Sequence, residues 1–257
     1  MAVTIDLNAD MGESYGRWTL GDDAALMPHL TSANIACGFH GGDPHVMRST
    51  VALAIENRVG IGAHVAFPDL IGFGRRQLAA SPAEVQDYVV YQAGAVRAFA
   101  EAAGGRLQHV KPHGALYTSI VGNAELAQAV AEGVGMLGPD VILLMPPAVG
   151  AAAARAGVPF VPEGYVDLDY DANGRLVIER VKQVRDPAAM GEKAVRLVRD
   201  GKVTTIDGGD LELRVESICV HGDAPNAPAI ARAIRERLED AGVELTPLTE
   251  LRAVAPR

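Results

Sequence analysis

The sequence has few cysteines and no long run of basic residues. It contains only two cysteines, Cys37 and Cys219, among 257 residues. Two cysteines cannot form the disulfide framework of a small secreted domain or a zinc site of paired cysteines. Lys and Arg number 23 against 32 Asp and Glu, a net charge of −9, and the longest basic run is Arg75-Arg76. Because nucleic-acid binding needs clustered positive charge, we expect no nucleic-acid partner.

Long hydrophobic runs are also missing. The most apolar stretch, residues 141–156, contains Pro146, Pro147 and Arg155, and it is too short to cross a bilayer. The N-terminal MAVTIDLNAD has no basic segment followed by an apolar run, so it does not look like a signal peptide. We therefore expect a cytoplasmic protein with no membrane partner. A composition with 49% hydrophobic and 21% charged residues is typical of globular proteins.

Short β-like runs alternate with helical patterns along the chain. One helical pattern begins at Ser81 and Glu84, which predict a capping box, and continues through Val85, Val89 and Ala93. Strands separated by helices predict βαβ units and a parallel sheet. About seven units without a long linker favour a closed α/β barrel in one domain over residues 1–257. The predicted strands are residues 3–7, 33–37, 60–65, 109–111, 141–145, 158–161 and 217–220.

Residues 165–184 break this alternation. Asp171-Ala172-Asn173-Gly174 is typical of a turn between two short strands. We expect a small hairpin insertion in the barrel at this point.

Polar residues gather where the predicted strands end. In a parallel barrel the loops after the strand C-termini carry the chemistry. Four of the seven histidines, His40, His64, His113 and His221, lie in such turns. This placement predicts one shared polar site. The turns that carry His, Asp or Lys are residues 6–13, 36–43, 63–69, 111–117 and 219–223.

Standard nucleotide and calcium motifs are missing. Asp6, Asn8 and Asp10 resemble the start of an EF-hand loop, but the glycine falls one residue late and Arg17 stands where the loop needs Glu. No phosphate-binding P-loop and no GxSxG nucleophile elbow occurs. We expect no ATP or dinucleotide binding by a standard loop of this chain.

Five segments together resemble the LamB/YcsF family, over a range from Ile5 to about Ala241. They are DLNADMGE, SANIACGFHGGDP, GAHVAFPD followed by FGR, VKPHGALY and CVHGD. The resemblance implies a seven-stranded β/α barrel of the glycoside hydrolase/deacetylase superfamily. It also implies a component of an ATP-dependent 5-oxoprolinase, which opens 5-oxo-L-proline to L-glutamate with partner subunits B and C. ATP is expected as a cosubstrate used through those partners.

One segment departs from the family's pattern. The family carries Glu-x-x-Ala-Asp-Arg-x-Tyr where this chain has Glu163, Asp167 and Tyr170, but Leu168 replaces the Arg. Residues 181–184 replace a small-residue stretch. The departure leaves a related lactam open as the substrate.

Lactam opening requires a base, a general acid and donors to the developing oxyanion. Asp10 and His40 are candidates for the base or the group that orients it. Lys111 is the candidate cation for a carboxylate or phosphate, and Arg75 is a second. His113 and His221 are candidate donors, with Asp223 expected to fix the tautomer of His221. The predicted catalytic residues are Asp10, His40, His64, Lys111, His113 and His221; the predicted substrate-binding residues are Asn8, Glu13, Asp43, Arg75, Tyr117, Glu163 and Asp223.

A divalent metal is a further expectation. The superfamily resemblance implies an Asp and two His around an ion, and Asp10 and His64 resemble two of these positions. Pro68 stands where a second histidine would follow, so His40 is the substitute, and the candidate ligands are Asp10, His40 and His64. Cys37 and Cys219 are expected to be buried and unreactive.

Three functions remain open at this point. The first is the lactam-hydrolysing component described above. The second is a stand-alone metal-dependent deacetylase of an N-acetylated sugar or amine. The third is a scaffold that only presents substrate to a catalytic partner. A homo-oligomer is also left open.

Overall fold

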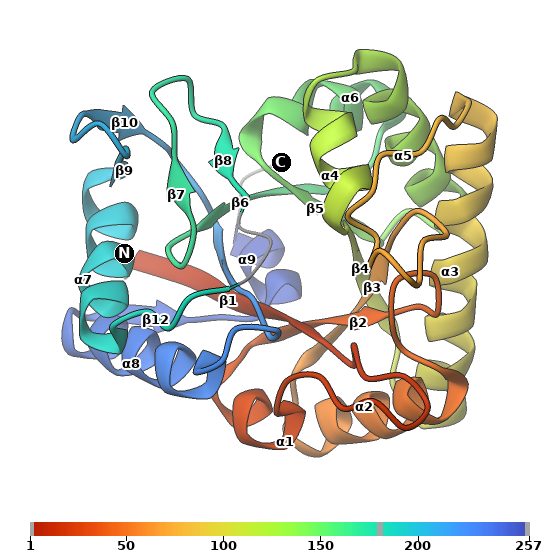
Figure 1. Cartoon of the computed structure of the whole chain (residues 1–257), viewed down its shortest axis with the longest axis horizontal. Coiled ribbons are helices and arrows are strands. Elements are labelled where there is room, and N and C mark those ends of the chain that lie inside the picture. The colour runs from red at the N-terminus through yellow and green to blue at the C-terminus, as the bar shows by residue number, and fades with distance from the viewer. Residues whose placement is uncertain (1–2, 179–181, 255–257) are drawn as a thin grey trace.

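A closed parallel barrel forms the centre of the computed structural model, which describes residues 3–178 and 182–254 (Figure 1). Strand β11 pairs in parallel with both β6 and β1 and so closes the barrel. A further strand, β12 (Val243–Leu245), extends the sheet beside the start of β1. The predicted barrel is confirmed. Within the described residues, its seven strands are β1 (Val3–Met11), β2 (Ser32–Ala36), β3 (Gly60–Val65), β4 (Leu107–Pro112), β5 (Ile142–Met145), β6 (Phe160–Tyr165) and β11 (Ser217–Val220).

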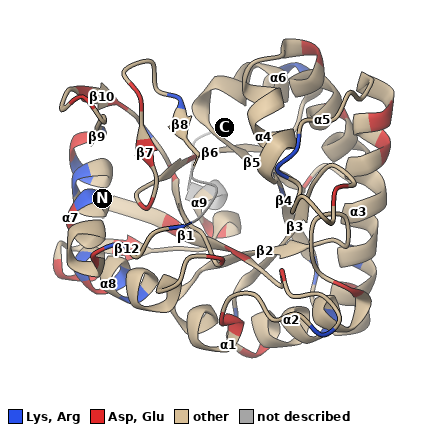
Figure 2. Cartoon of the chain, in the orientation of Figure 1, with Lys and Arg blue, Asp and Glu red and all other residues tan. Residues whose placement is uncertain are grey.

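Helices surround the barrel, and their outer faces carry many of the charged residues, most visibly on α7 and α8 (Figure 2). The predicted capping box is confirmed, because Ser81 accepts from the backbone N–H of Glu84 while the Glu84 carboxylate accepts from that of Ser81. No helix among the described residues has the length and apolarity to cross a membrane. The helices are α1 (Asp23–Leu26), α2 (Pro44–Glu56), α3 (Pro82–Ala102), α4 (Gly114–Val121), α5 (Ala124–Met136), α6 (Gly150–Ala156), α7 (Pro187–Asp200), α8 (Ala227–Asp240) and α9 (Leu248–Val254).

The expected hairpin insertion is present. Strands β7 (Asp169–Tyr170) and β8 (Leu176–Val177) pair antiparallel, and Asp171 accepts the backbone N–H of Asn173 in the turn. Residues 179–181 of the predicted insertion lie outside the described part of the chain. A second hairpin, β9 (Lys202–Thr204) with β10 (Asp210–Glu212), was not predicted. Helix α4 was not predicted either, because His113 gives it no side-chain cap.

A ladder of buried polar side chains fills the barrel interior. Successive inward positions on β1 are Asp6, Asn8 and Asp10, as the two-residue period of a strand requires. Asp6 accepts hydrogen bonds of 2.7 Å from Thr31 and from Ser32. Asn34 donates to the side chains of Asn8, at 2.7 Å, and of Asp10, at 3.0 Å. The ladder therefore leads from the N-terminal end of the barrel to Asp10, at its C-terminal end.

The ladder depends on one close approach to the backbone. His109 lies against Gly62 of the neighbouring strand, and a Cβ at Gly62 would stand 2.0 Å from His109 Nε2. The same nitrogen lies 2.8 Å from the side-chain oxygen of Asn34. Only glycine leaves room for this imidazole, so Gly62 permits the ladder to span the barrel.

Candidate active site

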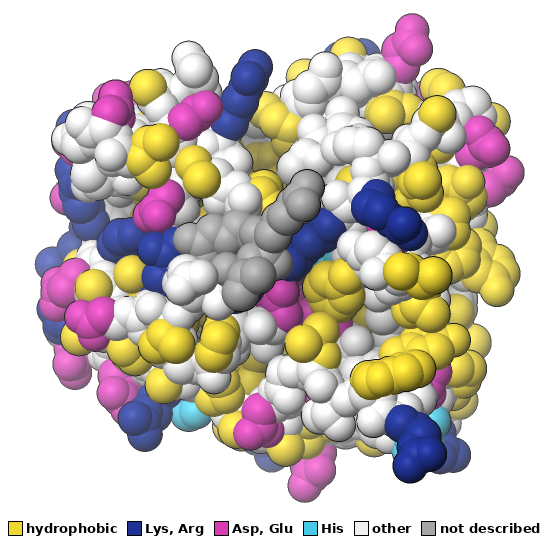
Figure 3. All heavy atoms as spheres, viewed as in Figure 1, with side chains coloured by type: hydrophobic (Ala, Val, Ile, Leu, Met, Phe, Trp, Pro, Cys, Tyr) yellow, Lys and Arg dark blue, Asp and Glu magenta, His cyan; other side chains and the backbone are white. Residues whose placement is uncertain are grey.

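The C-terminal ends of the strands enclose a pocket of about 230 Å³. In Figure 3, Lys or Arg and Asp or Glu side chains meet near the middle of the face in view. Five of the six predicted catalytic residues line the pocket, and His40 lies behind them, with its ring stacked on that of His113 at 3.9 Å between centroids. A volume of this size suits a small ligand. The five lining residues are Asp10, His64, Lys111, His113 and His221.

Lys111 is the central cation of the pocket. Its Nζ donates to Asp10 Oδ1 at 2.8 Å and lies 3.7 Å from Glu163 Oε2. It also lies 2.8 Å from the sulfur of Cys219. Burial alone would lower the pKa of this lysine, but the negative groups around it, Asp10 first, hold its pKa well above the usual value. Lys111 is therefore a fully charged group between two carboxyl groups.

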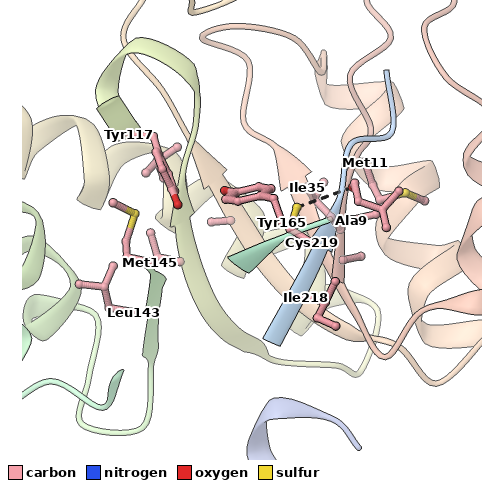
Figure 4. Packing of buried hydrophobic residues seen from close by; sticks show 14 of the residues in the cluster. Ala9, Met11, Ile35, Tyr117, Leu143, Met145, Tyr165, Ile218 and Cys219 are labelled. Carbon is pink, nitrogen blue, oxygen red and sulfur yellow. Dashed lines mark hydrogen bonds between the residues drawn. The ribbon is translucent and has the colours of Figure 1, made fainter. Parts of the chain in front are cut away.

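Two tyrosines form one wall of the pocket (Figure 4). The rings of Tyr117 and Tyr165 meet edge to face, with 6.0 Å between their centroids. The Tyr165 hydroxyl donates to Glu163 Oε1 at 3.0 Å, whereas Glu163 Oε2 and the Tyr117 hydroxyl are buried with no hydrogen-bond partner among the described residues. Burial raises the pKa of Glu163 to about 7. A larger cavity of about 530 Å³ adjoins this wall and is lined by Tyr117, Glu163 and Tyr165 among others.

Glu13, His40, His64 and His113 form a compact cluster beside the pocket. One possible ligand atom from each lies within 4.8 Å of the other three, and all four residues are buried, so the cluster could hold a metal ion. Burial raises the pKa of Glu13 and lowers the pKa of His40 and of His113. Of the three metal ligands expected from the sequence, the cluster contains His40 and His64 but not Asp10. The Asp10 oxygen nearest to His64 is instead hydrogen-bonded to Lys111 and Asn34.

His221 is oriented by a residue that the sequence analysis did not select. Asp167 Oδ2 lies 3.0 Å from His221 Nδ1 and accepts the His221 backbone N–H at 2.8 Å. Although burial opposes it, the charge of His221 keeps the pKa of Asp167 below its usual value. The expectation that Asp223 fixes the tautomer was wrong, because Asp223 pairs with Arg75 at 2.7 Å. The match of Asp167 to the family's Glu-x-x-Ala-Asp-Arg-x-Tyr pattern was the available signal.

Of the seven predicted substrate-binding residues, Arg75 and Tyr117 line the pocket of about 230 Å³, and the other five do not. Asn8 belongs to the buried ladder and donates to Ser217 at 2.7 Å. Asp43 caps α2, accepting the backbone N–H groups of His45 and Val46, and accepts a third from Gly16. Both side chains are therefore hydrogen-bonded within the fold, and their binding of substrate stays a prediction.

The remaining expectations concern the two cysteines and the cations. Cys37 and Cys219 are both buried, and burial raises the pKa of each thiol. Leu168, in place of the family's arginine, lines the pocket, and so does Lys182, which the sequence analysis did not select. Val181 of the departing segment lies outside the described residues.

Comparisons with known proteins agree on the family. Residues 5–253 match the LamB/YcsF family. The chain is 49% identical, over 94% of its length and 98% of the relative's, to the 5-oxoprolinase A subunit of Nocardia farcinica. The crystal structure of a lactam utilization protein from Thermus thermophilus has a TM-score of 0.89 and 44% identity, covering 95% of this chain and 100% of that one.

A more distant likeness shows the fold alone. The structure titled T48 deacetylase with substrate covers 99% of this chain and 93% of its own, with a TM-score of 0.50 at 14% identity. By the match over residues 5–253 and the identity to its relatives, this chain belongs to the LamB/YcsF family.

Proposed function

We propose that this chain is the lactam-opening component of an ATP-dependent 5-oxoprolinase, acting on 5-oxo-L-proline or a related lactam. The observation that carries the proposal is the position of Lys111, a buried cation between Asp10 and Glu163 at the wall of a pocket of about 230 Å³. A cation so placed can hold the negative charge that develops on the carbonyl oxygen of a small cyclic amide. The relatives that are named as the A subunit of 5-oxoprolinase support the same substrate class.

The reaction needs an external source of energy. Opening an unstrained lactam is uphill near neutral pH, and ATP can drive it by placing a phosphate on the amide oxygen. Because the sequence has no P-loop, we assign this activation to partner subunits B and C. The location that follows is the cytoplasm, where ATP is available.

The pocket residues can then divide the ring opening among them. Asp10 lies beside both Lys111 and His64 and accepts the proton of the attacking water, whose oxygen bonds to the ring carbonyl carbon. Lys111 holds the phosphate on the carbonyl oxygen, and Arg75 holds the substrate carboxylate. His221, with Nδ1 turned to Asp167, gives a proton from Nε2 to the ring nitrogen as the C–N bond breaks. A second water then hydrolyses the resulting acyl phosphate and releases glutamate and phosphate.

The experiment compares the chain alone with the chain mixed with its cognate subunits B and C. The isolated chain should release no glutamate from 5-oxo-L-proline and ATP, whereas the mixture should release glutamate and phosphate together. Steady ATP-dependent glutamate release by the isolated chain would contradict the division of labour. The deacetylase alternative rests on a likeness of fold at 14% identity, and acetate release from an N-acetylated sugar by the isolated chain would favour it.

A further inference from the structure

We propose that Glu13, His40, His64 and His113 bind one divalent transition-metal ion, for which Zn²⁺ is the best fit. The four residues come from the ends of four neighbouring strands, β1 to β4. The inference concerns metal binding and does not depend on the reaction proposed above.

The spacing of the ligand atoms suits one ion. His113 Nδ1 lies 3.0 Å from His64 Nε2 and 3.8 Å from Glu13 Oε1, and His40 Nε2 lies 3.2 Å from the same Glu13 oxygen. Ligands at the zinc bond lengths found in proteins stand about 3.3 Å apart in a tetrahedron. The three distances bracket that value. The rings of His40 and His113 are stacked nearly parallel, so one of them would turn for both nitrogens to point at the ion.

Hydrogen bonding fixes the tautomers of two of the rings. His64 Nδ1 lies 3.0 Å from the carbonyl oxygen of Lys111, and His113 Nε2 lies 2.9 Å from that of Phe73. A carbonyl oxygen only accepts, so both nitrogens donate. The other nitrogen of each neutral ring then carries a lone pair. These two nitrogens are the pair that lies 3.0 Å apart, and two lone pairs at that distance require a cation between them.

The cation between the two rings would also lie beside the carboxyl group of Glu13. This carboxyl group is buried, and among the described residues it forms no ion pair with a lysine or arginine. Two cations of the adjoining pocket are already engaged, Lys111 with Asp10 and Arg75 with Asp223. A proton shared by His64 and His113 would supply one positive charge for two carboxylates, since Asp10 Oδ1 lies 3.3 Å from His64 Nε2 and Glu13 Oε1 lies 3.8 Å from His113 Nδ1. A divalent ion among the four ligands supplies two positive charges and accepts both lone pairs.

The ligand types select the class of metal. Three imidazoles and one carboxylate suit Zn²⁺ or another late first-row ion, whereas Mg²⁺ and Ca²⁺ prefer oxygen ligands. Carbonyl groups that orient the ligating histidines, as those of Lys111 and Phe73 do, are typical of metal sites. Four protein ligands fill a tetrahedral shell, so the ion would hold the four strand ends together. His64 and His113 also line the pocket, where a bound ion would supply positive charge.

The experiment measures metal content and thermal stability of the full chain. Wild-type chain, loaded with Zn²⁺ and passed through gel filtration, should keep close to one ion per chain. Removing the ion with a chelator should lower the Tm by several degrees, and Zn²⁺ should restore it. His40→Gln should lose the ion, because His40 contributes a ligand. The matched control is His45→Gln, a change at the exposed start of α2. This variant should keep the ion.

Co²⁺ provides a readout that does not depend on the variants. Its visible absorption in wild-type chain should show the intensity of a tetrahedral site, and Zn²⁺ should displace it. Two results would overturn the inference: no retained ion in wild-type chain with a Tm that Zn²⁺ leaves unchanged, or equal retention by His40→Gln and His45→Gln.

Discussion

The ammonium of Lys111 lies 2.8 Å from Asp10 Oδ1, and neither side chain is more than 5% exposed. The two residues stand at the ends of β4 and β1, strands that are separated in the barrel by β2 and β3. The bond therefore spans the C-terminal opening of the barrel. It joins the polar ladder of the interior to the pocket.

Changing Lys111 to Met should affect both stability and activity. Removing one partner of a buried ion pair costs about 3–5 kcal/mol of the free energy of unfolding, because Asp10 is left as an unpaired buried charge. Glutamate release by the assembled complex should fall about a hundredfold or more, as for other lost charge-stabilising donors. Chemical denaturation and turnover measure the two effects.

Two further variants make this prediction specific. The partly exposed pair between Lys193 and Asp169 at 3.3 Å provides the control, and Lys193→Met should change stability by less than about 1 kcal/mol. The double variant Lys111→Met with Asp10→Asn should be more stable than Lys111→Met alone. Near-normal turnover of Lys111→Met would remove this residue from the site.

Stability should depend on pH through Glu163. Burial raises the pKa of Glu163 from 4.5 to about 7 in the folded chain, so the folded state holds its proton more tightly than the unfolded state. Its contribution is fully present below pH 4.5 and is lost as pH rises through about 7, a loss of about 3 kcal/mol. Glu163→Gln mimics the protonated form. Its stability relative to wild type should therefore increase over this pH range, and parallel unfolding curves would contradict the assignment.

Arg75 should contribute to recognition of the substrate carboxylate. It lines the pocket and is held by Asp223, so Arg75→Gln should raise the KM for 5-oxo-L-proline about tenfold or more. A lactam of the same ring size without the carboxylate should show a much smaller change. Arg232→Gln, on the outer face of α8, is the control and should leave both KM values unchanged. An equal rise for both lactams would mean that Arg75 does not read the carboxylate.

Asp167 should act by positioning His221. Asp167→Asn removes the carboxylate that fixes the ring, so kcat should fall by about a hundredfold while KM changes little. The pH profile of kcat should also shift, since the charge beside His221 is lost. Asp169→Asn, two residues along the chain, is the matched control. A loss of stability in Asp167→Asn with an unchanged pH profile would indicate a purely structural role.

The sequence predicted the barrel because its strands and helices have strong local signals. The capping box at Ser81 and the strand over residues 60–65 were both predicted where the structure has them. The position of polar residues at strand ends also predicted that Asp10, His64, Lys111, His113 and His221 would face one pocket, and the structure places them there. This follows from parallel topology, which brings all strand C-termini to one end.

Other features depend on which side chains meet across the barrel, and no local signal contains that information. Asp223 is two residues from His221 in the sequence and Asp167 is 54 residues from it, and only the geometry shows that Asp167 is the one that contacts the ring. Asp43 has the residue type of a ligand but serves as a helix cap. Asn8 looks like a loop ligand in sequence, yet β1 extends to Met11 and keeps it inside the barrel.

The most direct test of the central claim uses the complex of this chain with its cognate subunits B and C. Glutamate and phosphate release from 5-oxo-L-proline and ATP should be measured for the wild-type chain and for Asp10→Asn, with assembly checked by gel filtration. The account predicts equal release of both products by wild type, and an assembled Asp10→Asn complex whose glutamate release falls by at least about a hundredfold. Wild-type rates of glutamate release by Asp10→Asn would contradict the claim that this pocket opens the lactam.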